Sequence, residues 1–90
     1  MPSRKVTIRN ELGLHARTAT RLVECANQFT CDVLMSHEDR RVNGKSIMGI
    51  LTLAAGPGMV IGLETRGADE KLALNALSEL IQSGFGEPEI

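Results

Sequence analysis

Hydrophobic and polar positions alternate along three short segments of the chain, and this period of two is typical of half-buried β-strands. The segments are residues 4–9, 31–35 and 59–66, and residues 40–42 can form a further short strand between the last two. In the first, Val6 and Ile8 fall on one face, whereas Lys5 and Thr7 fall on the other. Polar residues at 36–39 predict a turn, so the second and third strands should pair as a hairpin.

The period changes to that of a helix at residues 16–29 and again at 47–54. The first helix carries one apolar stripe, formed by Ala19, Leu22, Val23 and Ala26. In the second, the residues with helical spacing are Ile50, Leu53 and Ala54. Ser46 precedes the second helix and is a favourable N-cap.

A third helix is predicted after Asp69, a favourable N-cap residue, with Glu70 in its first turn. Its buried stripe is expected to be Leu72, Ala73, Ala76, Leu77, Leu80 and Ile81. Gly84 is well placed as the C′ residue that follows this helix.

The order of elements is therefore β-α-β-β-α-β-α, in a single domain that covers residues 1–90. Helices that pack on one face of an antiparallel sheet would bury all of these stripes together. The sequence predicts an α+β fold, an open-faced sandwich in which three helices lie on one face of a four-stranded antiparallel sheet.

Charge and composition exclude several classes of partner. The net charge is −1, the basic residues are scattered, and no tryptophan or tyrosine is available to stack on bases, so nucleic acid is not expected as a partner. No apolar run approaches the roughly 20 residues of a membrane span, and residues 1–5 lack the apolar region of a signal peptide. We expect a cytoplasmic protein, and a monomer by default.

The two cysteines do not indicate a metal site. Cys25 and Cys31, with two distant histidines, do not have a recognisable zinc-binding spacing. In a cytosolic chain they are expected to be small buried hydrophobes. A chain of 90 residues is also too short to enclose a large cofactor cavity, so no metal or cofactor is expected.

Residues 13–17, Gly-Leu-His-Ala-Arg, place His15 and Arg17 at the beginning of the first predicted helix. The unpaired N–H groups there favour a neutral imidazole, which is the nucleophilic form. The N–H groups of Ala16, Arg17 and Thr18 could hold a phosphate attached to the ring, and the Arg17 guanidinium could add charge-assisted bonds. No general base or acid accompanies His15 in the sequence, so a stable phosphoryl adduct fits better than hydrolysis.

These residues resemble the HPr family, the histidine-containing phosphocarriers of the bacterial phosphotransferase system. The resemblance rests on residues 13–17 and on residues 42–51, Val-Asn-Gly-Lys-Ser-Ile-Met-Gly-Ile-Leu, and it extends over the element order of essentially the whole chain. It implies that Nδ1 of His15 accepts a phosphoryl group from enzyme I, which phosphoenolpyruvate charges, with assistance from Arg17. The phosphoryl group would then pass to a histidine of an enzyme IIA protein.

One position departs from the family pattern. The family commonly has proline after the arginine, whereas this chain has Thr18. Thr18 keeps an N–H group and adds a hydroxyl, which we expect to contact the phosphate or solvent. The departure leaves open whether the chain belongs to a sugar-type or a nitrogen-related branch.

Ser46 is by itself only a favourable N-cap. Residues 43–49, however, resemble the segment of HPr proteins that HPr kinase/phosphorylase phosphorylates on serine. Regulatory phosphorylation of Ser46 would add negative charge and would weaken docking to an acidic region of enzyme I.

The second helix has more apolar residues than one buried face can hold. If Ile50 points inward, then Ile47, Met48 and Leu51 cannot all do so. These three residues, with Thr20, are expected to form an exposed docking patch beside His15; the alternative is a fully buried short helix.

Two rival functions remain open. One is a regulatory binding module that acts mainly through phosphorylated Ser46, although such a module would not need His15 with Arg17. The other is a small α+β enzyme that hydrolyses acyl phosphates, although no water-activating residue is evident. His37, in a polar turn, is expected to be solvated.

Overall fold

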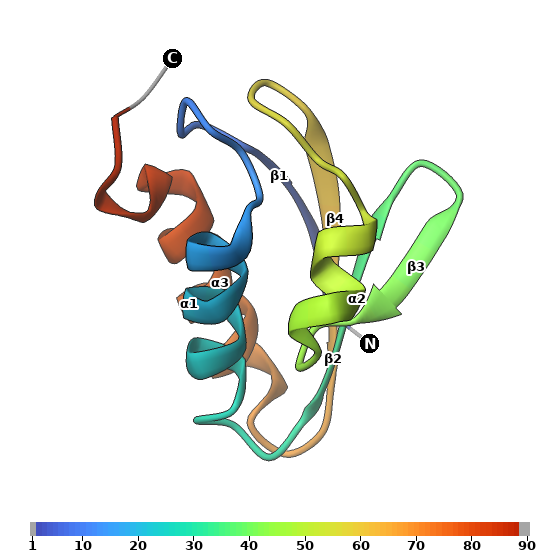
Figure 1. The fold of residues 1–90 in the computed structure, drawn as a ribbon. Coiled ribbons are helices and arrows are strands. Elements are labelled where there is room, and N and C mark those ends of the chain that lie inside the picture. The colour runs from blue at the N-terminus through green and yellow to red at the C-terminus, as the bar shows by residue number, and fades with distance from the viewer. Residues whose placement is uncertain (1, 89–90) are drawn as a thin grey trace.

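Three helices cover one face of a four-stranded antiparallel sheet (Figure 1). The computed structural model describes residues 2–88. Its elements are β1 (Ser3–Thr7), α1 (Ala16–Ala26), β2 (Asp32–His37), β3 (Arg40–Asn43), α2 (Ile47–Thr52), β4 (Val60–Arg66), α3 (Glu70–Gln82) and the short 3₁₀-helix η1 (Gly84–Gly86). The predicted fold class and element order are confirmed, with η1 as an addition.

The order of strands in the sheet is β1-β4-β2-β3, and every neighbouring pair is antiparallel. Val6 lies opposite Ile61 and Met35 lies opposite Leu63, and each of these side chains is at most 2% exposed. The predicted alternation therefore marks the face of the sheet that meets the helices. Met59 was predicted to begin the fourth strand, but it precedes β4 and is 43% exposed.

The stripe predicted for the first helix is confirmed. Its buried members are Ala19, Leu22, Val23 and Ala26. The helix ends at Ala26 rather than at Phe29. The N–H groups of Gln28 and Phe29 donate to carbonyls three residues earlier, so the chain there forms a tighter turn than an α-helix.

The stripe predicted for the last helix is partly wrong. Ala73, Leu77 and Ile81 are buried as expected, Ala76 and Leu80 are half-buried, and Leu72 is 67% exposed. Leu74 and Ser78 are buried instead. Apolar residues occupy more than one side of α3, and packing against β1 and β4 selects the face that contains Leu74. Ser78 is accommodated there because its hydroxyl donates to the Leu74 carbonyl at 2.7 Å.

Asp69 occupies the N-cap position of α3 but does not cap the helix with its side chain, which corrects the expectation. Its carboxylate accepts hydrogen bonds from the N–H groups of Thr30 and Cys31, at 2.8 and 2.9 Å. Asp69 thus ties the beginning of α3 to the chain that enters β2. At the other end of α3, Gly84 follows the C-cap Ser83 with a φ of +72°, as predicted for a C′ residue.

Both cysteines are free thiols. Cys31 is 2% exposed and Cys25 is half-buried, and burial raises the pKa of each thiol. Among residues 2–88, no group of three or more His, Cys, Asp or Glu side chains is arranged to hold a metal ion.

His37 was expected to be solvated, but its side chain is mostly buried. Its side chain is 15% exposed, and Nδ1 donates to the carbonyl of Leu53 at 3.2 Å. The expectation is wrong because residue 53, at the end of α2, lies over the β2–β3 hairpin and supplies an acceptor that is distant in sequence.

The helices of the described part of the chain are short. The longest, α3, has 13 residues, whereas a membrane span needs roughly 20. None of the helices between residues 2 and 88 is long and apolar enough to cross a bilayer.

Candidate functional site

The loop between β1 and α1 is held against the end of α2, and this contact positions His15. The N–H of Leu14 donates to the carbonyl of Ala55 at 2.9 Å. Gly13 adopts a φ of +69°, and a Cβ atom at this position would lie only 2.8 Å from the Ala55 carbonyl oxygen. Glycine is therefore required for the loop to approach residue 55 so closely.

His15 is the N-cap of α1, as the sequence predicts. Its Nδ1 accepts a hydrogen bond from the N–H of Arg17 at 3.3 Å. In return, its own N–H donates to the Thr18 hydroxyl at 3.0 Å, which completes a capping box. The ring is thus oriented by the first turn of the helix that follows it.

Thr18 is fully buried, so its hydroxyl does not contact solvent. The hydroxyl lies 3.2 Å from the carbonyls of Gly13 and His15. This corrects the expectation that the Thr18 side chain could be solvated. The first turn of α1 is formed, as predicted, by Ala16, Arg17 and Thr18.

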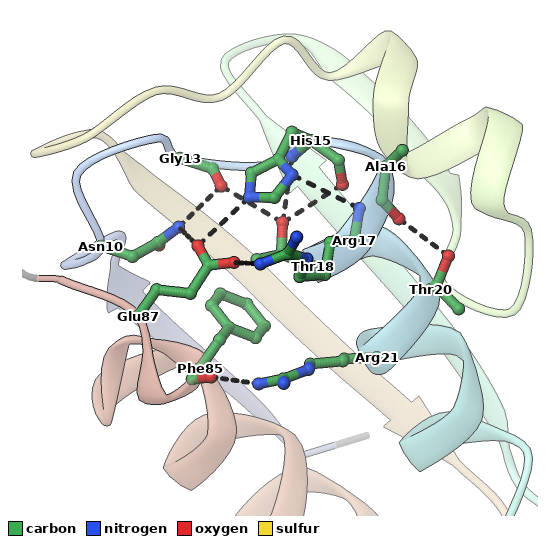
Figure 2. A network of polar contacts seen from close by, with 10 residues as sticks. All are labelled: Asn10, Gly13, His15, Ala16, Arg17, Thr18, Thr20, Arg21, Phe85 and Glu87. Carbon is green, nitrogen blue, oxygen red and sulfur yellow. Dashed lines mark hydrogen bonds and ion pairs between the residues drawn. The ribbon is translucent and has the colours of Figure 1, made fainter.

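Glu87 is the acid that the sequence analysis did not expect. Its Oε1 lies 3.1 Å from Nε2 of His15, although 72 residues separate the two in the chain. Figure 2 shows the ring between Glu87 on one side and the backbone N–H of Arg17 on the other. Asn10 donates to the same carboxylate oxygen at 3.1 Å, and Asn10 itself is fully buried.

The C-terminal segment reaches the site through η1. Gly84, Phe85 and Gly86 all have positive φ values, between 59° and 74°, and they turn the chain back toward the loop before α1. Phe85 anchors this turn, because it is 1% exposed and its carbonyl accepts a hydrogen bond from Arg21 of α1 (Figure 2). The Gly-Phe-Gly sequence is the only local signal of this return.

The contacts of Glu87 determine its own ionisation and the tautomer of the neutral His15 ring. The hydrogen bond from His15 lowers the pKa of Glu87, with smaller contributions from the Asn10 hydrogen bond and from the charges of His15 and Arg17, and together they outweigh burial, which raises it. The carboxylate is therefore ionised at neutral pH and only accepts. A neutral imidazole must then carry its hydrogen on Nε2 and its lone pair on Nδ1, a tautomer assigned from these hydrogen bonds.

Arg17 lies close to this pair without being fixed by it. Its Nη1 is 3.9 Å from Oε2 of Glu87, and its side chain is 73% exposed. The second carboxylate oxygen of Glu87 is buried and accepts no hydrogen bond within residues 2–88. The guanidinium is thus largely exposed to solvent and lies next to the carboxylate that contacts His15.

The second helix presents the expected apolar surface. Ser46 is its N-cap and accepts from the N–H of Gly49 at 3.0 Å. Met48 is 72% exposed and Ile47 is 38% exposed, which excludes a fully buried helix, while Ile50 is fully buried as predicted. Leu51 is half-buried.

Thr20 lies on the neighbouring helix α1 and is exposed. In Figure 1, α1 and α2 lie next to each other on the same face of the sheet. We call the four residues Thr20, Ile47, Met48 and Leu51 the docking patch.

Comparison with known proteins identifies the family. The family model for the PTS HPr component phosphorylation site matches residues 2–83. The chain belongs to the HPr family. It is 51% identical over 89 residues to the phosphocarrier protein HPr of Neisseria meningitidis serogroup B, with 99% of this chain and 100% of that protein covered. It is 49% identical over 89 residues to HPr of Cupriavidus necator, with the same coverage.

Solved HPr structures have the same fold. The crystal structure of HPr from Thermoanaerobacter tengcongensis matches with a TM-score of 0.93 and 41% identity, covering 97% of this chain and 98% of that one. HPr from Bacillus anthracis matches with a TM-score of 0.87 and 40% identity, covering 90% and 96%. The resemblance noted in the sequence is confirmed, and the chain is an HPr phosphocarrier of the phosphotransferase system.

Proposed function

We propose that Nδ1 of His15 accepts a phosphoryl group from phosphorylated enzyme I and passes it to an enzyme IIA protein. One observation carries this proposal. His15 is held at the beginning of α1 by two contacts, with Nε2 at Glu87 and Nδ1 at the Arg17 N–H, and this leaves the nucleophilic lone pair on Nδ1. Membership of the HPr family supplies the class of reaction.

The transfer step follows from this geometry. The Nδ1 lone pair forms the new nitrogen–phosphorus bond while the bond between phosphorus and the donor breaks. The ring becomes positively charged, and the Glu87 carboxylate on Nε2 offsets that charge without removing the proton. The Arg17 N–H, released from Nδ1, then faces the phosphoryl group at the helix N-terminus, where anions are favoured.

The Arg17 guanidinium has a separate role in the proposal. It is exposed and 3.9 Å from Glu87, so it can move to the phosphoryl oxygens and donate charge-assisted hydrogen bonds. The same movement in reverse would release the phosphoryl group to the next acceptor. The step is a transfer between proteins, and in this proposal the chain has no independent catalytic turnover.

The docking patch is proposed to contact enzyme I and enzyme IIA in turn. Ile47 and Met48 on α2 are exposed, and α2 lies next to α1, the helix that His15 caps and that carries Thr20. A shared surface would let one small protein bind both partners in turn. We propose that it does so as a monomer in the cytoplasm.

Ser46 is proposed as a regulatory site for HPr kinase/phosphorylase. It precedes the helix that carries Ile47 and Met48 as its N-cap, so a phosphoryl group there would place about 1.5 to 2 negative charges beside the docking patch. The rival function, a regulatory module that acts mainly through phosphorylated Ser46, does not account for the paired contacts of His15 with Glu87 and Arg17.

The deciding experiment is intact mass spectrometry after incubation with enzyme I, Mg²⁺ and phosphoenolpyruvate. We expect an acid-labile gain of one phosphoryl group in the wild type and no gain in His15→Ala. The enzyme I preparation is first shown to phosphorylate another carrier. No gain in the wild type under these conditions would overturn the carrier proposal and favour the Ser46 module.

A further inference from the structure

The methionines of this protein differ sharply in the exposure of their side chains. Among residues 2–88 they are Met35, Met48 and Met59. Met35 is 1% exposed and lies in the core. Met59 is 43% exposed, and its sulfur accepts a hydrogen bond from the N–H of Gly56 at 3.2 Å. Met48 is 72% exposed.

Met48 lies where a chemical change of its side chain is not expected to destabilise the fold. It lies in the first turn of α2, whereas Ile50 on the opposite side of the same helix is fully buried. The neighbouring exposed residue is Ile47. A change at the Met48 sulfur would therefore alter the docking patch and leave the core unchanged.

We propose that Met48 is a site of reversible oxidation by hydrogen peroxide, and that its oxidation weakens the docking of enzyme I. This inference rests on the proposed function. In the reaction the thioether sulfur forms a bond to one peroxide oxygen as the O–O bond breaks; the sulfur is oxidised by two electrons and the other oxygen leaves as water. The product is methionine sulfoxide, which a methionine sulfoxide reductase converts back to the thioether with two electrons from a thiol reductant, the oxygen leaving as water.

The sulfoxide changes the docking patch through its polarity. Methionine is flexible and apolar and adapts well to binding surfaces, whereas the sulfoxide oxygen is a strong acceptor. In a complex that covers Met48, this oxygen would lose its water and meet an apolar surface, which is unfavourable. We expect the KM of enzyme I for the oxidised protein to rise at least about tenfold, equivalent to a loss of ~1.4 kcal/mol of binding. The kcat for phosphorylation of His15 is expected to stay within about twofold.

The order of oxidation is tested first and needs no enzyme I. The protein is treated with graded hydrogen peroxide, and each methionine-containing peptide is quantified by mass spectrometry. We expect the gain of one oxygen at Met48 before Met59, and at Met59 before Met35. Equal or earlier oxidation of Met59 would overturn the assignment of Met48 as the preferred site.

The effect on docking is then measured by the kinetics of phosphorylation by enzyme I. Met48→Leu keeps an apolar side chain that peroxide cannot oxidise, so its KM is expected to be the same before and after treatment. Met48→Gln places a polar group at the same position and is expected to match the oxidised wild type without treatment. Met59→Leu is the control and should respond to peroxide as the wild type does.

Two results separate this proposal from the proposed function. If the untreated wild type is phosphorylated on His15 but oxidation at Met48 leaves KM unchanged, the oxidation proposal fails and the carrier function stands. If the untreated wild type is not phosphorylated, the carrier function itself fails. Restoration of the low KM by methionine sulfoxide reductase would support reversibility, and a permanent loss would overturn it.

Discussion

The Oε1 atom of Glu87 lies 3.1 Å from Nε2 of His15, across 72 residues of sequence. The same oxygen accepts a hydrogen bond from the buried Asn10, so two hydrogen bonds hold this oxygen of the carboxylate in place. This relationship assigns the hydrogen of the neutral ring to Nε2 and the lone pair to Nδ1. In the proposed phosphoryl transfer, Glu87 therefore acts through His15, as a positioning residue.

Replacement of Glu87 tests this role. Glu87→Gln keeps an oxygen that accepts from Nε2 but removes the charge, whereas Glu87→Ala removes both. We expect the rate of phosphorylation to fall by about tenfold to a hundredfold in Glu87→Ala, the size typical of a misplaced reacting group, and by less in Glu87→Gln. ¹⁵N NMR of the His15 ring should show a mixture of tautomers only in Glu87→Ala. Equal rates with an unchanged ring spectrum would contradict the role.

The loop before His15 depends on Gly13. Gly13→Ala forces a Cβ atom to within 2.8 Å of the Ala55 carbonyl oxygen at a φ of +69°, so we expect a loss of about 1–3 kcal/mol in the free energy of unfolding and slower phosphorylation of His15. Gly56→Ala is the matched control, because its nearest contact would be Met59 at 3.8 Å; its effect should stay within about 0.5 kcal/mol. Urea denaturation measures both.

The Thr18 hydroxyl is expected to contribute to stability. Thr18→Val has nearly the same shape but leaves the His15 N–H without its acceptor, so the free energy of unfolding should fall by about 1–3 kcal/mol. Thr20→Val removes a hydroxyl from the exposed side of the same helix, where it donates to the Ala16 carbonyl, and should change stability by less than about 0.5 kcal/mol. Similar losses in the two variants would show that the capping box is unimportant.

The contacts of Asp69 predict a dependence of stability on pH. Hydrogen bonds, first from the Thr30 N–H and then from the Cys31 N–H, lower the pKa of Asp69. A lowered folded-state pKa means that ionised Asp69 contributes stability above its unfolded value of about 3.9, and that this contribution is lost as the pH falls through the folded value. The thermal midpoint of the wild type should exceed that of Asp69→Asn at pH 7, and the gap should shrink below about pH 4.

The control for this titration is Asp39→Asn, because Asp39 is exposed in the hairpin turn. Its thermal midpoint should follow that of the wild type at every pH. A gap between wild type and Asp69→Asn that stayed constant from pH 7 to pH 3 would contradict the electrostatic origin of the contribution.

Ser46 provides the test of regulation by charge. Ser, Asn and Asp are all favourable N-caps, so neither Ser46→Asp nor Ser46→Asn should lower the thermal midpoint appreciably. Only Ser46→Asp adds a negative charge beside the docking patch, and its rate of phosphorylation by enzyme I should fall on the order of tenfold, or ~1.4 kcal/mol. Equal rates for the two variants would argue against regulation by charge at this position.

Local patterns in the sequence predicted most of the fold. The period of two placed Val6, Ile61 and Leu63 on the inner face of the sheet, and helical spacing placed Ala19 and Leu22 in the core. These predictions held because a strand or a helix repeats its buried face at a fixed interval. Leu72 was misplaced, because α3 has apolar residues on more than one side and only contact with the sheet chooses among them.

By itself, the sequence determined the strands, the helices and the position of His15 at the beginning of α1, since these follow from neighbours a few residues apart. Only the tertiary structure decided that Glu87 meets the ring of His15, and that Asp69 binds the chain before β2 instead of capping its own helix. The physical reason is that hydrogen-bond partners distant in sequence are brought together by the packing of the whole chain, and no local period records that packing.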